Sequence, residues 1–219
     1  MRGIRGVLYL LLIPRPNMNR FLVTCCAISL AANSWLNAAE LSSEEIDRAS
    51  SHLKNTNAAF LAATDGLSAE QWNFKSAPDR WSVAQVAEHI AATEDALFGL
   101  IQAQVMTAPA RTETVNVKEI DDLILQAIPD RSAKRQAPEP LQPTARFGSG
   151  PESVRHFKEA RVKTLAFLTE TKGLRDHAID SPLGQKLDAY QWLLFISAHS
   201  ERHTKQINEV KADPSFPKS

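Results

Sequence analysis

Two histidines near the end of this 219-residue chain have the spacing of metal ligands. His199 and His203 lie in the segment 188–211, whose apolar residues recur at three- and four-residue steps and predict one amphipathic helix. Residues four positions apart lie one above the other on a helix, so both imidazoles fall inside the buried stripe. They can point at a common centre and hold a divalent cation with little strain. Two ligands do not complete such a site.

Another histidine lies on a second predicted helix whose beginning is well specified. Ser82 and Gln85 form a capping box, and Trp81 and Val86 occupy the two positions of a hydrophobic staple. The helix is expected to continue to about residue 106, and His89 falls within its apolar stripe. The other histidines have no partner at ligand spacing and are interpreted as exposed or hydrogen-bonded residues: His52, His156 and His177.

The rest of the chain is also predicted to be mainly helical. Residues 129–150 contain four prolines and no apolar period, which predicts an exposed loop, with a lid over an active site as the alternative. Residues 174–187 are expected to form another loop, and no alternating strand pattern is seen. The fold class is therefore an all-α four-helix bundle with an additional short helix and a long loop between the second and third core helices. Further helices are predicted over 41–64, 67–74 (a short turn), 117–128 and 151–172.

Residues 1–39 have the layout of a secretory signal peptide. They contain four arginines and no acid, an apolar run over 21–32 and small residues before position 40, and Met18 is an alternative start. Both cysteines lie in this segment, so the mature chain is expected to be exported, into the periplasm or beyond the cell, without disulfides. The bundle is assigned to residues 40–213 and a C-terminal tail to 214–219.

Charge and composition narrow the range of partners. The whole chain has 25 basic and 25 acidic residues; removing the four arginines of residues 1–39 leaves 21 and 25, a formal net charge of −4. No basic stripe favours nucleic acid, and nothing after residue 39 is apolar enough to span a membrane. The expected partner is a small-molecule substrate or ligand. The sequence does not decide whether the chain forms a homodimer.

Two segments resemble the signature blocks of the DinB/YfiT-like superfamily. They are RWSVAQVAEHI at 80–90 and HSERHTKQI at 199–207, in the same order and at a similar separation, with residues 107–150 as the least similar part. The resemblance implies a four-helix bundle that binds one divalent metal through His89, His199 and His203. Members with known chemistry include thiol-dependent S-transferases and isomerases and metal-dependent hydrolases, and many others have no assigned reaction.

Three neutral imidazoles would leave a zinc-like ion at least one open position, which is the arrangement of a catalytic site. A bound water can then have its pKa lowered to about 7, and the open position can equally hold a substrate thiolate or carbonyl. Zinc is the first choice of metal, and nickel, iron or manganese would also accept these nitrogen ligands.

Residues next to the histidines receive different interpretations. Gln206 lies one turn beyond His203 on the same face and is the candidate to orient a ligand or the substrate. Glu88 and Glu201 adjoin ligands in sequence but point roughly 100° to 200° away around their helices, so solvated glutamates are expected. Four further side chains are interpreted as structural, namely Arg202 and Lys205 at the surface and Trp81 and Trp192 in core packing, with cavity lining as the alternative for the tryptophans.

Two kinds of function follow from the sequence. The first is an exported metalloenzyme, hydrolytic or transferase-like, in which hydrolysis is favoured because cytosolic thiols are less available outside the cytoplasm. The second is a non-enzymatic bundle braced by a structural metal, or an envelope protein that binds a small ligand. No serine, cysteine or carboxylate has the arrangement of a nucleophile or general base, which motivates the second hypothesis.

Overall fold

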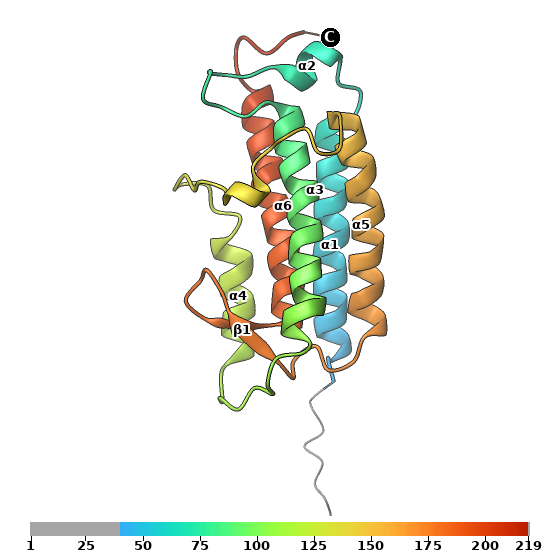
Figure 1. Cartoon of the computed structure of the whole chain (residues 1–219), viewed down its shortest axis with the longest axis vertical. Helices are drawn as coiled ribbons and strands as arrows, with labels where there is room; N and C mark the ends of the chain where they lie inside the picture. Colours follow the sequence, from blue (N-terminus) through green and yellow to red (C-terminus); the bar gives the residue numbers. More distant parts are fainter. Residues whose placement is uncertain (1–39, 219) are drawn as a thin grey trace, which may run out of the picture. The chain divides into compact units, whose positions relative to one another are not determined.

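Four long helices lie side by side in the computed structural model, which describes residues 40–218 (Figure 1). α1 and α3 are diagonally opposite, and each packs against both α5 and α6. The predicted all-α four-helix bundle is confirmed, whereas the predicted signal peptide lies outside the described residues. The core helices are α1 (Ser43–Thr64), α3 (Val83–Leu100), α5 (Gly150–Glu170) and α6 (Ala189–Lys211).

The shorter elements lie in the connections between these helices. α2 (Ala69–Asn73) precedes α3, and a π-helical turn, η1 (Ile101–Val105), prolongs α3. The long connection from α3 to α5 contains α4 (Val117–Ala127) and the 3₁₀ turn η2 (Glu139–Leu141). This connection is the predicted additional helix followed by the predicted long loop.

The predicted capping box at the start of α3 is confirmed. The Ser82 hydroxyl accepts a hydrogen bond from the Gln85 amide at 3.3 Å, and the Gln85 side chain accepts one from the Ser82 amide at 3.0 Å. Because two otherwise unpaired donors are satisfied, the first turn of α3 has a defined position. His89 lies two turns further along the same helix.

Residues 174–187 do not form a simple loop, so that prediction was wrong. β1 (Ala178–Asp180) and β2 (Lys186–Asp188) pair antiparallel, with Ile179 opposite Leu187. Strands of three residues are too short for an alternating pattern to be visible in the sequence. The turn of this hairpin brings Pro182 and Leu183 to the wall of a cavity described below.

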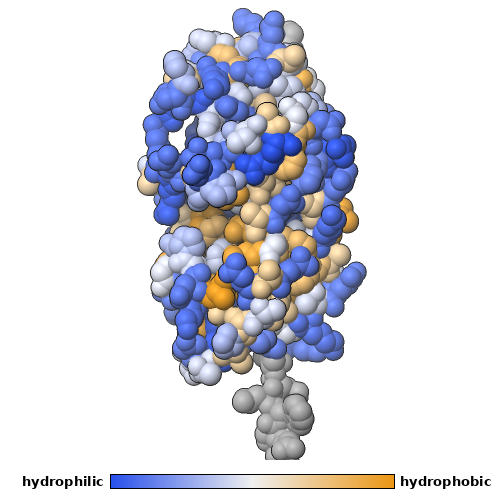
Figure 2. All heavy atoms as spheres, viewed as in Figure 1, coloured by the Kyte–Doolittle hydropathy of each residue, from blue (hydrophilic) through white to orange (hydrophobic). Residues whose placement is uncertain are grey.

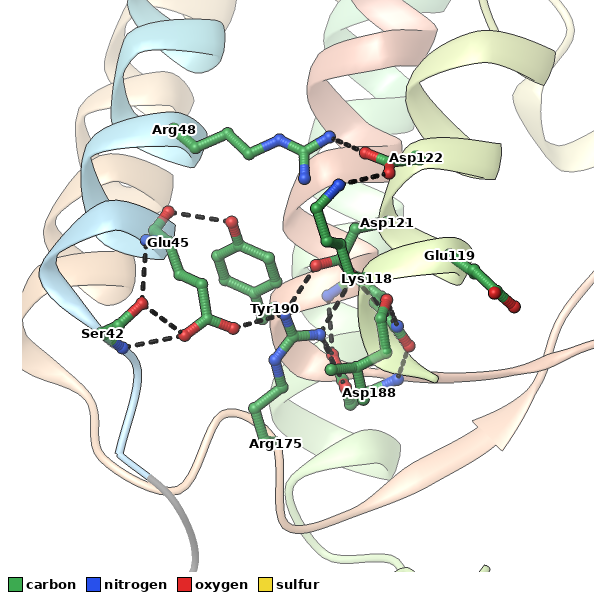
Figure 3. Close-up of polar contacts among 12 residues, drawn as sticks. Ser42, Glu45, Arg48, Lys118, Glu119, Asp121, Asp122, Arg175, Asp188 and Tyr190 are labelled. Carbon is green, nitrogen blue, oxygen red and sulfur yellow. Dashed lines mark hydrogen bonds and ion pairs between the residues drawn. The ribbon is translucent and has the colours of Figure 1, made fainter. Parts of the chain in front are cut away.

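A buried cluster of charges holds α4 and the hairpin against the bundle (Figure 3). The guanidinium of Arg175 lies 2.7 Å from carboxylate oxygens of Glu45 and Asp121 and 3.0 Å from Asp188. It also lies 4.1 Å from the ring centroid of Tyr190. Since these partners come from α1, α4 and the start of α6, one arginine connects three helices.

A second buried arginine connects the helices that carry the histidines. Arg161 of α5 forms two hydrogen bonds with Glu94 of α3, at 2.8 and 2.7 Å, and one with Ser200 of α6 at 2.9 Å. Arg161 and Glu94 are each 1% exposed, and an ion pair at that depth requires nearly complete hydrogen bonding. It therefore specifies how α3 and α6 sit relative to each other.

The face of the bundle drawn in Figure 2 is mostly hydrophilic. On the face that Figure 2 shows, hydrophobic side chains gather near mid-height within a largely polar surface. Among residues 40–218, no helix is long and apolar enough to cross a lipid bilayer.

Candidate metal centre

Packing of α3 against α6 brings three histidines together. Nε2 of His89 lies 3.2 Å from Nε2 of His199 and 3.2 Å from Nε2 of His203. One ring nitrogen from each residue lies within 4.8 Å of the other two. The stacking of His199 and His203 on α6 follows from their four-residue spacing, and the position of His89 follows from the packing of the two helices.

Hydrogen bonds on the far side of two rings determine which nitrogen carries the proton. Nδ1 of His89 lies 2.8 Å from the carbonyl oxygen of Leu141, and Nδ1 of His203 lies 2.7 Å from Oε1 of Gln206. Both oxygens are acceptors, so each Nδ1 must be the protonated donor. Arg131 donates to the same Gln206 oxygen at 3.4 Å, which supports that orientation of the amide. The Nε2 lone pairs of His89 and His203 therefore face each other.

This donor set fits a divalent metal. Two bare lone pairs 3.2 Å apart repel unless a cation or a proton lies between them. Metal–nitrogen bonds of about 2.0–2.1 Å in a tetrahedral site place the nitrogens about 3.3 Å apart, and an octahedral site places them about 3.0 Å apart. The two spacings from His89, each 3.2 Å, agree with a bound ion and do not choose between metals.

The surroundings keep the imidazoles neutral, which is the form that binds metal. Burial lowers the pKa of His203 to about 3, and the neighbouring His89 adds to the shift. Burial likewise lowers the pKa of His199 well below its usual value, with His203 as the next cause. For His89, burial lowers the pKa although the Leu141 carbonyl acts in the opposite direction.

Glu88 is not the solvated residue that the sequence predicted. It is 5% exposed and accepts hydrogen bonds from the backbone amides of Thr144, Ala145 and Arg146 at 2.7, 2.9 and 3.0 Å. Burial acts to raise the pKa of this carboxyl, but these hydrogen bonds outweigh it and the pKa is lowered. Glu88 thus fastens the loop that carries the Leu141 carbonyl to the helix that carries His89.

Arg202 is also buried, contrary to the prediction of a surface residue. It is 7% exposed and donates to the backbone carbonyls of Ile128, Asp130 and Ala133, which follow α4. Helix periodicity places Arg202 at the edge of the histidine stripe, about 60° around the helix from His199 and about 100° from His203. The segment that covers Arg202 comes from a distant part of the chain, so the sequence does not show that it is buried. Glu201 is partly exposed and contacts His52 and Lys205.

A cavity of about 720 Å³ opens beside the histidines. The predicted core packing of Trp81 and Trp192 is incomplete, because both tryptophans line this cavity. Residues 133–138 and 141–142 form another wall, so part of the predicted exposed loop covers the site, as the lid alternative described. Gln206 lines the cavity and contacts His203, which agrees with its expected orienting position.

The other histidines lie outside this cluster. Nδ1 of His52 lies 2.6 Å from the Ser197 hydroxyl, His156 lies 2.6 Å from an Asp95 oxygen, and His177 forms an isolated bridge with Ala110. The environments of His52 and His156 agree with the sequence interpretation, whereas the buried Nδ1 of His177 has no hydrogen-bond partner among the described residues. Sequence reasoning missed Leu141, because a backbone carbonyl in a proline-rich loop leaves no residue-type signal.

The fold and the histidine cluster define a helical-bundle protein with a candidate three-histidine metal centre. Residues 52–207 match the DinB superfamily, and the chain belongs to that superfamily. It is 31% identical over 147 residues to the uncharacterized protein YuaE of Bacillus subtilis (strain 168), which covers 67% of this chain and 86% of YuaE.

A solved structure has a similar fold. YfiT from Bacillus subtilis, described as a probable metal-dependent hydrolase with an unusual four-helix bundle topology, has a TM-score of 0.52 at 16% identity. The similarity covers 81% of this chain and 91% of the YfiT chain. At this level of identity the comparison shows a common fold.

Proposed function

We propose that the protein is a metal-dependent hydrolase of a small molecule, with a transferase reaction as the alternative. His89, His199 and His203 would hold a divalent ion, with zinc as the first choice. The observation that carries this proposal is that Nε2 of His89 lies 3.2 Å from Nε2 of both His199 and His203, at the wall of a cavity of about 720 Å³. Cavities of this size suit small molecules. The description of YfiT as a probable metal-dependent hydrolase supports the proposal.

The residues of this chain would supply the ligands and their orientation. When bound, the ion would act as a Lewis acid that activates water or polarises a substrate carbonyl. Leu141 and Gln206 hold two imidazoles in the tautomer that ligation needs. Burial keeps protons from competing for the ligand nitrogens near neutral pH.

Metal analysis combined with a substrate screen tests the proposal. The purified protein is expected to contain a single divalent ion per chain and to hydrolyse a member of a panel of esters, amides and lactones. His203→Ala should lose both the metal and the activity, whereas His156→Ala, outside the cluster, should keep them. Activity that survives in metal-free His203→Ala protein would exclude this mechanism.

A structural metal is the second candidate, because Asp79 is the single carboxylate among the described residues that line the cavity. A metal that only braces the bundle stabilises the folded state, so chelation should lower the melting temperature strongly. The hydrolase proposal instead expects chelation to abolish turnover. Turnover lost without a change in melting temperature would exclude the structural candidate.

We also propose that residues 1–39 direct export, on the basis of their charge and apolar pattern. Fractionation of cells that produce the full chain tests this directly. The expected result is a shortened chain in the periplasm or the medium. A full-length chain confined to the cytoplasm would contradict it.

A further inference from the structure

The cavity beside the histidines has an unusual charge for this protein. Five basic residues line it against one acidic residue, whereas residues 40–219 together have 21 basic and 25 acidic residues. A concentration of one sign of charge in a concave site attracts ligands of the opposite sign. The basic lining residues are Arg80, Arg131, Lys134, Arg135 and Arg202.

Two of these five have their hydrogen bonds taken by the protein itself. Arg131 forms a two-pronged ion pair with Glu209, with both distances 2.6 Å. Arg202 donates to backbone carbonyls and has no carboxylate partner within residues 40–218. Burial lowers the pKa of Arg202, and the positive charges of Arg131 and Arg135 add to that shift, in agreement with crowded positive charge.

The remaining three basic side chains are available to a ligand. Arg80, Lys134 and Arg135 are exposed, and in the described part of the chain none of them forms an ion pair. Because they are exposed while His89 and Trp192 are each 3% exposed, we place the basic residues at the mouth of the cavity and His89 and Trp192 deeper inside it.

The walls between mouth and floor are apolar and aromatic. Trp192 and Phe195 lie side by side with ring centroids 5.3 Å apart, and the Trp81 ring lies 5.0 Å from that of His89. Leu97 and Leu141 complete this part of the lining. Flat aromatic surfaces favour a planar apolar group in a ligand.

We propose that the substrate is an amphipathic anion with an aromatic or similarly sized apolar body and a carboxylate or phosphate group. The anionic group binds Arg80, Arg135 and Lys134 at the mouth, and the apolar body lies between the tryptophans. The scissile bond then faces the histidines. This substrate class rests on the proposed function, but the anion preference of the cavity is measurable without any reaction.

Calorimetric titration of chelator-treated, metal-free full-length protein tests this preference. The probes are hydrocinnamate, its neutral counterpart hydrocinnamyl alcohol, and the phosphate monoester of that alcohol. Because charge-assisted hydrogen bonds are about twice as strong as neutral ones, each anion should bind at least about tenfold more tightly than the alcohol. The order of the two anions identifies whether carboxylates or phosphates are preferred. Omitting the metal ensures that the anion does not simply ligate it.

Two double variants test which residues cause the preference for anions over the neutral alcohol. The double variant Arg80→Gln/Arg135→Gln should lose most of the difference between anion and alcohol, while its affinity for the alcohol stays unchanged. The matched control Lys158→Gln/Lys163→Gln changes two exposed residues of α5, which does not line the cavity, and should keep the full difference.

Equal affinity for anion and alcohol in the unaltered protein would overturn the inference, as would a preference that survives in the double variant. Either result leaves the metal proposal standing if metal content and hydrolysis of neutral esters still depend on His203. Conversely, a third outcome is a protein that prefers anions and yet binds no metal. That result would contradict the proposed metal-dependent hydrolase and would support the cavity as an anion-binding site.

Discussion

Nε2 of His89 and Nε2 of His203 lie 3.2 Å apart, although 114 residues separate them in the chain. Each ring is turned toward the other by an acceptor on its far nitrogen, the Leu141 carbonyl for one and Gln206 for the other. Residues outside the cluster therefore decide where the ligand lone pairs point. They are the most informative positions to change.

Gln206→Ala should weaken metal binding by about 10- to 100-fold, because His203 loses the acceptor that selects its tautomer. Competition with a chromophoric chelator measures the change. Asn208→Ala, an exposed position of the same helix, is the matched control and should bind metal like the unaltered protein. Equal affinities for both variants would show that the 2.7 Å hydrogen bond does not orient the ligand.

Glu88→Gln should destabilise the fold by about 1–3 kcal/mol, because one amide oxygen cannot satisfy three backbone donors and leaves at least one unpaired. The loop that carries Leu141 would then be held less firmly, so metal affinity should fall as well. Denaturant unfolding and chelator competition measure the two effects. Glu170→Gln, at the exposed end of α5, should change neither quantity.

The metal-free protein should lose stability as the pH falls below about 6.5. An unfolded histidine takes up a proton near that pH, whereas the folded pKa of His203 is lowered to about 3, so the unfolded state binds more protons across this window. Each such histidine contributes a slope of up to about 1.4 kcal/mol per pH unit. Urea unfolding at a series of pH values measures the slope.

His203→Gln should make this slope shallower, and the surface variant His156→Gln serves as the control. Comparing variants removes the contribution of other titrating groups that both proteins share. An unchanged slope in His203→Gln would contradict a neutral His203 in the folded, metal-free protein.

Arg175→Met should destabilise the protein by about 3–5 kcal/mol, because it leaves Glu45, Asp121 and Asp188 together without their shared counter-charge. Thermal and denaturant unfolding measure the loss. Arg155→Met removes an exposed arginine that pairs with neighbours on α5 and should cost less than about 1 kcal/mol. A similar small loss at Arg175 would show that the buried cluster does not hold α4 in place.

Much of the bundle could be predicted because helices are specified locally. Ser82 and Gln85 lie three residues apart and mark the start of α3 without any information from the rest of the chain. The same periodicity places His199 and His203 on one face of α6. The third histidine, His89, was assigned from family resemblance, and its position 3.2 Å from both others agrees with that assignment.

The sequence by itself determined the helical segments, the stacked histidines and the position of Gln206 one turn beyond them, because each depends on spacing within one helix. Only the tertiary structure decided that Leu141 contacts His89, that Glu88 and Arg202 are buried, and that basic residues meet at the cavity mouth. Those contacts join segments that are distant in the chain. The periodicity of apolar residues within one helix does not show which distant loop packs against each of its faces.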